Sequence, residues 1–398
     1  MQLFTPLQYL KIDIANSFGL DKENWDTRLA WFNENEDNLD NLMVEADEPA
    51  MFYAGVQAYK KVLKGLPIGY PVSLDATSSG MQLLACITGC LKSAQMCNVV
   101  DVGSRRDSYT DIYHIMQEKG RIEGGIDRSG VKQAIMTALY SSKAIPIQIF
   151  GEENVKQFYL TMSEEVPGAW ALNEAFLNMW NPNIDTYKWI MPDNFHVQIK
   201  VIDSVKESFD FLGKERVIFR KVHQPTKEGR SLGANTIHSI DGMVVRELVG
   251  RCNYNKDRIE SIKAMLENRP YKTLDVYDED THMVNTLWGL YKSSKFLSVR
   301  ILDHINHRTI KLVDPDVILK LVNSLPNKPF QVLTIHDCFR VLPNYGNDLR
   351  LQINEIYAYI VESEMLSFLV SQLLGKYTPV VKGELTGDMV REANYILS

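Results

Sequence analysis

The stretch that decides the fold predicted for this chain is Asp127-Arg-Ser-Gly-Val-Lys-Gln-Ala-Ile-Met-Thr-Ala-Leu-Tyr-Ser-Ser-Lys143. In a helix, Arg128, Lys132 and Tyr140 fall within a wedge of about 120°, since each residue turns by about 100°. Two cations one turn apart, followed by an aromatic ring on the same side, suit a nucleotide: the cations meet its triphosphate and the ring meets its sugar and base. The alternative is an amphipathic helix with a solvated basic face.

Two aspartates support the nucleotide interpretation. Asp75 lies in Ser73-Leu-Asp-Ala-Thr-Ser-Ser-Gly-Met-Gln82, and Asp337 lies in Leu333-Thr-Ile-His-Asp-Cys-Phe-Arg-Val-Leu342. Both follow apolar, β-prone residues, which predicts a position at the end or turn of a strand. A lone aspartate there is usually a turn or cap residue. Two carboxylates on neighbouring strands, however, can hold two divalent ions for an in-line phosphoryl displacement, and Mg²⁺ is the predicted metal because its ligands are hard oxygens.

These three stretches resemble motifs A, B and C of the single-subunit DNA-directed RNA polymerases of T-odd phages and mitochondria, which share a superfamily with the family A DNA polymerases. The run Ala76-Thr-Ser-Ser-Gly-Met-Gln82 and the Cys338 that follows Asp337 are more similar to the RNA enzymes. The segment Asn235-Thr-Ile-His-Ser-Ile-Asp-Gly242 resembles the family's His-Ser-x-Asp-Gly element. A DNA polymerase or primase, and a non-catalytic scaffold that binds nucleic acid, are the competing interpretations.

The resemblance implies a DNA-dependent RNA polymerase that transfers nucleotides from NTPs to the RNA 3′-OH with two Mg²⁺ ions as cofactors. Asp75, the carbonyl of Ala76 and Asp337 are the expected metal ligands. In the family, the remaining site residues bind the incoming nucleotide or support the primer end. The expected catalytic residues are Asp75, Asp337, Lys132 and Tyr140; the expected nucleotide-binding residues are Arg128, Lys132, Tyr140, His238 and Tyr113; and His336 is expected to support the primer end.

Tyr113 has an alternative interpretation, and two nearby positions depart from the family pattern. Tyr113 belongs to Tyr109-Thr-Asp-Ile-Tyr113, which resembles the family's Asp-Ile-Tyr element at the base of the fingers, but an aromatic residue on a helix is often a core residue. Gln133 stands where close relatives often have Arg, which removes a cation from the phosphate region. Ser141 stands where Gly is usual, which puts in doubt the close backbone approach that glycine permits.

The fold class that the resemblance implies is α+β and predominantly helical, with the palm and fingers of a right-hand polymerase. Residues 1–97 are expected to form the first part of the palm, residues 98–238 the fingers, and residues 239–398 the second part of the palm. About 245–328 exceeds the family pattern and is predicted to be an inserted helical subdomain. Residues 1–70 are predicted to be helical, and Leu349 to Leu374 are predicted to form one long buried helix.

Residues 196–224 alternate as in a hairpin, with predicted strands 196–202 and 216–222 and a turn near Gly213. A two-stranded ribbon can enter the major groove, and in the family a hairpin at this place reads the promoter. The candidates for DNA contact are Arg216, Arg220 and Lys221. The alternative is a plain hairpin that packs on the fingers.

The resemblance also implies partners. Family members carry several hundred residues before motif A, including an N-terminal domain, a thumb and a Gly-Arg motif, whereas 74 residues precede Asp75 here. We therefore expect a split enzyme similar to the two-chain polymerases of N-four-type phages, with the thumb and N-terminal domain on a second chain that forms a heterodimer with this one. Template DNA, the RNA transcript and NTPs are further expected partners, and a separate promoter-recruiting factor is another candidate.

Composition sets broader limits. The formal net charge is −7, so contacts with nucleic-acid phosphates are expected to be local or shared with a partner.

The five cysteines contain no CxxC pair, which indicates reduced thiols and no zinc site or disulfide framework. No apolar run approaches the length of about 20 residues that a membrane span needs, and no signal peptide is recognised. The expected location is the cytoplasm of an infected bacterial host.

Overall fold

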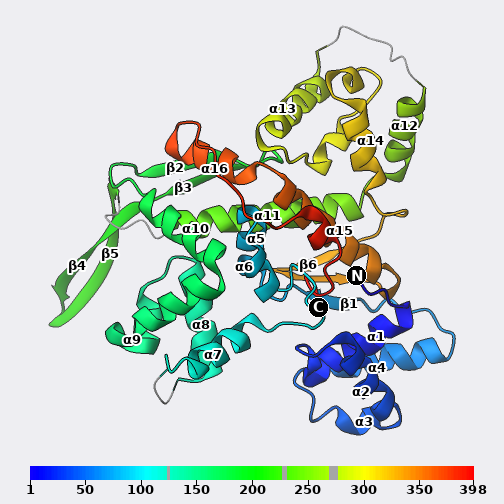
Figure 1. Cartoon of the computed structure of the whole chain (residues 1–398), viewed down its shortest axis with the longest axis horizontal. Helices are drawn as coiled ribbons and strands as arrows, with labels where there is room; N and C mark the ends of the chain where they lie inside the picture. The colour runs from blue at the N-terminus through cyan, green and yellow to red at the C-terminus, as the bar shows by residue number, and fades with distance from the viewer. Residues whose placement is uncertain (123–125, 226–230, 269–276) are drawn as a thin grey trace.

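A small antiparallel sheet lies at the centre of the chain (Figure 1). The computed structural model describes residues 1–122, 126–225, 231–268 and 277–398. Strands β1 (Val72–Asp75), β7 (Cys338–Val341) and β6 (Leu333–Ile335) are hydrogen-bonded in the order β1-β7-β6. Alternate residues of β1 and β7 are buried, which is the period of a sheet with one face on a core. These buried residues are Val72, Leu74, Phe339 and Val341.

Helix α5 (Ser79–Thr88) follows β1 and is buried along its length from Met81 to Ile87. It packs against α10 (Pro167–Asn178), α11 (Ser231–Cys252) and α15 (Gly346–Glu362). Gln82 is the polar residue within this run, and its amide donates to the Thr77 hydroxyl at 2.9 Å and to the carbonyl of Cys97 at 3.0 Å. The helix therefore fixes the backbone that leaves β1.

The C-terminal region forms two helices where one was predicted. Helix α15 ends at Glu362, and α16 (Met365–Leu374) begins after a break at Ser363, whose backbone is extended with ψ 168°. The Ser363 hydroxyl donates to the Ile360 carbonyl at 2.7 Å and accepts from the Met365 amide at 3.2 Å. Such local serine bonds compete with the helical ladder, which explains the break. The short 3₁₀ helix Pro343–Tyr345 precedes α15, and α17 (Gly387–Arg391) follows α16.

The N-terminal residues form a helical lobe beside β1, as predicted (Figure 1). Thr5 and Gln8 form a reciprocal capping box at the start of its first helix. The buried carboxylate of Asp13 accepts from the Ser73 amide and the Tyr70 hydroxyl, both at 2.7 Å, and so ties that helix to β1. The elements of the lobe are α1 (Pro6–Ala15), a π-helix (Asn16–Leu20), α2 (Trp25–Asn35), a 3₁₀ helix (Glu36–Asn38), α3 (Leu39–Leu42) and α4 (Pro49–Leu63).

The segment predicted to form the fingers is helical between α5 and the ribbons. Its central helix, α8, covers Arg128–Leu139, and the Asp127 carboxylate caps it by accepting from the Gly130 amide at 2.8 Å. The helix predicted around Arg128 and Lys132 is therefore confirmed, although it ends one residue before Tyr140. It packs against α7 (Ser108–Glu118) and α9 (Ala144–Glu165), and α6 (Leu91–Met96) contacts α9.

The predicted hairpin is present, but its first strand was wrong. Residues 196–200 form β3 (His196–Lys200), which pairs with β2 (Thr186–Ile190), and the hairpin consists of β4 (Ile202–Phe211) and β5 (Lys214–Pro225). The Val201 amide donates to the Asp185 carbonyl at 2.8 Å, so the chain leaves one ribbon and enters the next at this residue. The turn lies at Leu212 and Gly213, both with positive φ, as a tight two-residue hairpin turn requires.

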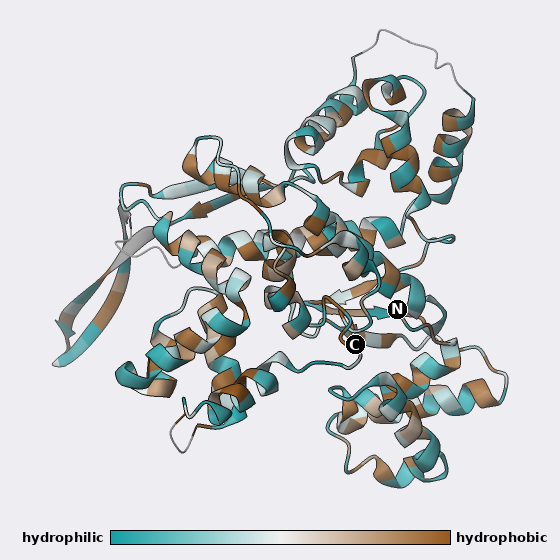
Figure 2. Cartoon of the chain, in the orientation of Figure 1, coloured by the Kyte–Doolittle hydropathy of each residue, from teal (hydrophilic) through white to brown (hydrophobic). Residues whose placement is uncertain are grey.

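The predicted inserted subdomain forms a lobe with its own core (Figures 1 and 2). Helix α11 continues unbroken through Cys252, and its apolar residues pack in the main core, so the separate lobe begins after 252 and not at 245. Its elements are α12 (Lys256–Glu267), α13 (Glu279–Ser294), 3₁₀ helices Val299–Asp303 and Thr309–Leu312, and α14 (Pro315–Asn323). Among the described residues, no helix is both long and apolar enough to span a membrane.

Candidate active site

The central sheet brings Asp75 and Asp337 together. Asp75 is the last residue of β1 and lies opposite Cys338, while His336 and Asp337 form the turn between β6 and β7. The Ala76 amide donates to the Asp337 carbonyl at 3.1 Å. Two backbone bonds between Asp75 and Ser398, at 3.1 and 2.8 Å, add the last residues of the chain to the same edge. The three expected metal ligands, Asp75, Ala76 and Asp337, thus lie at one point, and His336 is exposed beside them with φ 56°.

The two carboxylates at this point repel each other, and the charge of Arg340 offsets only part of the effect on Asp75. Burial raises the pKa of Asp75, the hydrogen bond from the Cys338 thiol opposes that shift, and the charge of Asp337 raises it further. A divalent cation would relieve this repulsion, so the two carboxylates and the carbonyl of Ala76 fit Mg²⁺ by their chemistry. Within the described residues, no group of three or more His, Cys, Asp or Glu side chains is arranged to hold a metal. Two carboxylates alone leave coordination positions for substrate phosphates and water.

A cleft of about 510 Å³ joins these aspartates to the basic face of α8. Asp75, Ala76, Asp337, Arg128 and Lys132 all line it, although Arg128 and Lys132 come from a different lobe of the chain. Its other charged residues come from three places: the N-terminal lobe, the segment that leads into α7, and strand β7. These are Asp13, Asp21, Lys22, Asp47, Glu48, Arg105, Asp107 and Arg340.

Both cations of α8 are held by residues of α7 or its cap. Arg128 donates to the carboxylate of Asp107 and to the hydroxyl of Thr110. Burial alone would raise the pKa of Asp107, but hydrogen bonds from Thr110 and Arg128 outweigh it and lower that pKa. The Lys132 ammonium lies 5.5 Å from the ring centroid of Tyr109. These contacts orient both side chains before any ligand arrives.

Tyr109, and not the expected Tyr113, is the aromatic residue of α7 that lines the cleft. The Tyr109 hydroxyl lies 3.3 Å from the hydroxyl of Ser78, in the segment after β1. Tyr113 is one turn further along, and its hydroxyl accepts from the Gln117 amide at 2.8 Å. The spacing of four residues puts both tyrosines on one helix face, and the sequence does not show which turn reaches the cleft.

Tyr140 and His238 form a stacked pair just beyond α8. Their ring centroids are 4.8 Å apart with an interplanar angle of 10°. Gly80 makes room for the tyrosine, because a Cβ there would lie 2.8 Å from its hydroxyl oxygen. Burial raises the pKa of Tyr140 to about 12, and the charge of Asp241 adds to the shift. The two predicted ribose-recognition residues, which are 98 positions apart in sequence, are therefore brought into contact.

Asp241 was not among the predicted site residues, although the sequence contained a signal for it. It lies in the same Asn235–Gly242 segment as His238, one helical turn further along α11. Burial raises its pKa, the charge of Asp337 raises it further, and His238 opposes the shift. The charge of Asp241 therefore acts on Tyr140, and the pKa of Asp241 in turn depends on the charge of Asp337.

Ser141 has the backbone conformation that makes glycine usual at this position. Its φ is 66°, in the left-handed region that L-residues rarely adopt. Its buried hydroxyl donates to the side-chain oxygen of Asn173 at 2.6 Å, and the Asn173 amide donates to the Ala138 carbonyl at 3.0 Å. Gly233 leaves space for this hydroxyl, since a Cβ there would lie 2.9 Å from it. Gln133, the other departure, is exposed next to Lys132.

The candidate DNA-contact residues of the ribbon do not share one face. Arg216 pairs with Phe209 across the strands and Arg220 pairs with Val205, so both lie on the face that also carries Lys214. Lys221 follows directly after Arg220 and therefore points to the opposite face. Arg220 forms an ion pair with Glu207 at 2.9 Å. Apolar residues of the ribbon are exposed between these charges: Val205, Phe209, Phe211, Leu212, Val217, Ile218 and Phe219.

Comparison with known proteins gives a consistent result. The family model described as DNA-dependent RNA polymerase matches residues 5–215, about half of the chain. A probable DNA-directed RNA polymerase of Gelasinospora sp. (strain G114) is 23% identical over 362 residues, which cover 84% of this chain and 40% of that protein. A probable DNA-directed RNA polymerase of Neurospora crassa is 31% identical over 161 residues, covering 34% of this chain and 18% of that protein. The DNA-directed RNA polymerase of Pseudomonas phage phiKMV is 27% identical over 171 residues, covering 34% and 21%. The chain thus spans less than half the length of each of these curated relatives.

Substitutions at Ser141 test the strain at the end of α8. We expect Ser141→Ala to destabilise the chain more than Ser141→Gly, by about 1 kcal/mol, because both remove the bond to Asn173 but only glycine relieves the positive φ. Chemical unfolding followed by circular dichroism measures the order. Ser142, which has no positive φ, is the matched control. At position 142, the glycine variant should be no more stable than the alanine variant. An alanine variant at 141 as stable as the glycine variant would contradict the assignment of strain.

Proposed function

This chain belongs to the DNA-dependent RNA polymerase family, and from that premise we propose that it carries the catalytic centre of a DNA-directed RNA polymerase. The observation that carries the proposal is the cleft in which Asp75 and Asp337 of the central sheet meet Arg128 and Lys132 of α8. Paired carboxylates opposite paired cations suit the transfer of a nucleotide from a triphosphate, because the charges that develop in the reaction have a counter-charge on each side. A non-catalytic scaffold would not need this arrangement.

The proposed metal ligands are Asp75, the carbonyl of Ala76 and Asp337. When bound there, two Mg²⁺ ions would supply electrostatic stabilisation of the attacking and leaving oxygens. The protein's contribution is to hold both carboxylates at one edge of the sheet, where the β1–β7 pairing fixes their backbones. His336, at the same turn, is proposed to support the primer end.

Arg128 and Lys132 are proposed to bind the triphosphate. The guanidinium of Arg128 has five N–H donors, so donors remain for phosphate oxygens after its bonds to Asp107 and Thr110. The ammonium of Lys132, which lies over the ring of Tyr109, is proposed to donate a proton to pyrophosphate as it leaves. The same ring lines the cleft and offers a surface for the nucleotide, a role that the sequence assigned to Tyr113.

Tyr140 and His238 are proposed to recognise the ribose 2′-hydroxyl of the incoming nucleotide. Their stack fixes both rings, and the Tyr140 hydroxyl, whose pKa burial raises further to about 12, is a hydrogen-bond donor at neutral pH. A polar site built for a hydroxyl group discriminates against a ligand that lacks one, since its own groups then stay unpaired. This supports RNA synthesis over DNA synthesis.

The rest of the enzyme is proposed to lie outside these 398 residues. The relatives are more than twice as long as the parts that match this chain. We propose a second chain that supplies a thumb and the Gly-Arg motif, as in the two-chain enzymes of N-four-type phages, in the cytoplasm of an infected host. Exposed apolar residues on α4 and just after it, including Tyr53, Leu63 and Leu66, offer a docking face on the N-terminal lobe.

The proposal is tested by primed-template extension with NTPs and Mg²⁺. We expect Asp75→Asn and Asp337→Asn each to reduce extension by at least about 10³-fold without unfolding, because each removes a metal ligand. Asp257→Asn, on the exposed face of α12, is the control and should be as active as the wild type. Near-normal extension by either site variant would contradict the two-metal assignment. The assay is run with the chain alone and with neighbouring gene products, and full processive extension by the lone chain would refute the split enzyme.

Sugar selection gives a separate prediction. Tyr140→Phe should raise the kcat/KM for dNTPs relative to that for NTPs by about 10-fold or more, because the hydroxyl that pairs with the ribose is removed. Tyr113→Phe is the matched control, since the Tyr113 hydroxyl is bonded to Gln117 on its own helix. It should leave the ratio unchanged. An unchanged ratio in Tyr140→Phe would place the sugar gate elsewhere.

The ribbon β4–β5 is proposed to contact promoter DNA through the face that carries Lys214, Arg216 and Arg220. Arg216→Ala and Arg220→Ala should each weaken duplex binding and reduce the slope of log K against log salt by about 0.9, the effect of one lost phosphate contact. Fluorescence anisotropy with a labelled duplex at several salt concentrations measures both quantities. Lys221→Ala, on the opposite face, should change them less. Equal effects from all three would refute the single-face assignment.

A further inference from the structure

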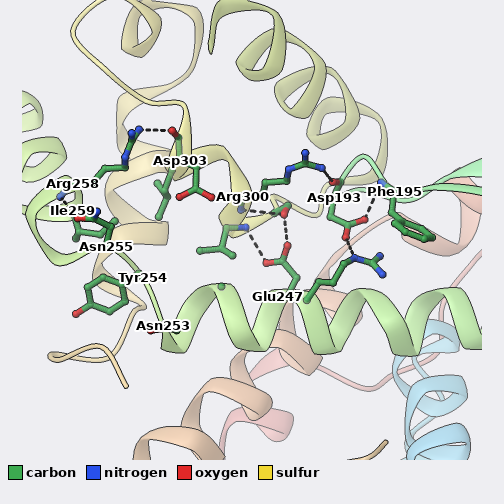
Figure 3. Close-up of a pocket in the computed structure, with 15 residues that line it drawn as sticks. Asp193, Phe195, Glu247, Asn253, Tyr254, Asn255, Arg258, Ile259, Arg300 and Asp303 are labelled. Atoms are coloured by element: carbon green, nitrogen blue, oxygen red, sulfur yellow. Dashed lines mark hydrogen bonds and ion pairs between the residues drawn. The ribbon is translucent and has the colours of Figure 1, made fainter. Parts of the chain in front are cut away.

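A second cleft, of about 410 Å³, lies where the inserted lobe joins the rest of the chain (Figure 3). Its lining comes from three regions: the second half of α11, the turn between β2 and β3, and the first and middle parts of the insertion. None of its lining residues belongs to the candidate active-site cleft. Its volume is within the range of small-ligand sites.

Three arginines from three different segments converge on this cleft: Arg246 of α11, Arg258 of α12 and Arg300 of the 3₁₀ helix Val299–Asp303. Each is held by a contact with the protein. Arg246 bonds the Asp193 carboxylate at 2.5 Å, Arg300 bonds the Asp193 carbonyl at 3.1 Å, and Arg258 bonds the Asp303 carbonyl (Figure 3). The three guanidinium groups are therefore oriented in advance.

Arg246 has an unused donor inside the structure. Its guanidinium lies 4.2 Å from the centroid of the Phe195 ring, which packs against its plane. Its Nη2 is buried and has no hydrogen-bond partner among the described residues. A ligand oxygen at this point would satisfy that donor, which the protein itself leaves without an acceptor.

The carboxylates of the cleft only partly compensate these cations. Asp193 is 3% exposed and is already paired with Arg246. Glu247 is buried, and its oxygens accept from the Ser298 hydroxyl and the Val299 amide. Burial raises the pKa of Glu247 to about 7, so near neutral pH it carries only part of a negative charge. Asp303 is the remaining, exposed carboxylate. Asp193 and Glu247 are thus already engaged within the protein, which leaves Asp303 as the exposed counter-charge to the three arginines.

We propose that this cleft binds a phosphate group, either of a nucleotide or of a nucleic-acid strand. Phosphate oxygens match the fork of a guanidinium, which is why arginine is preferred where phosphate is recognised. A divalent cation does not suit a cleft in which three arginines converge. The amides of Asn253 and Asn255 lie on the same wall and add donors for a phosphate ester or its sugar. The site does not depend on the proposed catalytic function, because it shares no residue with it.

Equilibrium binding in EDTA tests the proposal, since removal of metal suppresses triphosphate binding at the catalytic aspartates. The full chain is titrated with three probes: a fluorescein-labelled 12-nucleotide single-stranded DNA, ATP and inorganic phosphate. The test variant is Arg258→Gln with Arg300→Gln, which leaves the buried pair of Arg246 and Asp193 intact. We expect about 10-fold or more weaker binding of at least one ester probe. If that probe is the DNA, the slope of log K against log salt should fall by about 1.4, or 0.7 for each lost contact.

Two controls separate a site from a general loss of charge. Lys263→Gln with Lys256→Gln removes two exposed cations from α12 that do not line the cleft, and it should change binding much less. Arg258→Lys with Arg300→Lys keeps the charge but loses the fork, and it should recover only part of the affinity. Unfolding midpoints confirm that each variant is folded.

The outcomes have distinct meanings. Weaker binding of DNA alone identifies a strand backbone as the ligand, and weaker binding of ATP alone identifies a nucleotide. An effect confined to inorganic phosphate, or one that the two lysine substitutions reproduce, would overturn the proposal. Because the readout is binding, failure here leaves the extension assay unaffected, and failure of that assay leaves this result unaffected.

Discussion

The antiparallel pairing of β1 with β7 is the constraint on which the candidate active site depends. It places Asp75 opposite Cys338, and the β6–β7 turn then places Asp337 beside them. The two carboxylates at one edge of the sheet repel each other. They stay close because hydrogen bonds from three other parts of the chain fix the backbone around them. Asp13 bonds β1 from the N-terminal lobe, Gln82 holds the segment after it, and Ser398 pairs with Asp75 from the other end of the chain. Each support comes from a different part of the sequence, so the site is assembled only in the complete fold.

Much of this site was predictable because its residues carry local patterns. The spacing of Arg128 and Lys132 predicts a helix face, and apolar residues before Asp75 and Asp337 predict strand ends, and both predictions were confirmed. The position of Tyr109 in the cleft was not predictable, since Tyr113 has the same helical phase and only the packing of α7 against α8 distinguishes them. The first hairpin strand was wrong for a similar reason. Apolar and polar residues continue to alternate through Val201, although the chain leaves one ribbon there and enters the next. Such alternation predicts a strand but does not show which strand is its partner.

The departures from the family pattern are explained by their surroundings. Ser141 keeps a backbone conformation that favours glycine, and the bond to Asn173 together with the space beside Gly233 makes the serine tolerable. The sequence shows the substitution but not the compensation, because Asn173 and Gly233 are distant in the chain. The start of the insertion follows the same logic. The insertion was predicted to begin at about residue 245, yet helix α11 continues to Cys252 because its apolar face is still covered by the main core.

Helix α11 links the two clefts. Its first half carries His238 and Asp241, which face Tyr140 and the charge of Asp337, and its second half carries Arg246 and Glu247, which hold the insertion. A helix transmits position with little deformation, since each turn is fixed by its own hydrogen bonds. The bonds from Ser298 and Val299 to Glu247 attach the inserted lobe to the same helix that carries His238, one of the two residues proposed to recognise the ribose. A phosphate bound between Arg246 and Arg300 would therefore brace the lobe against a helix that the proposed catalytic site also needs.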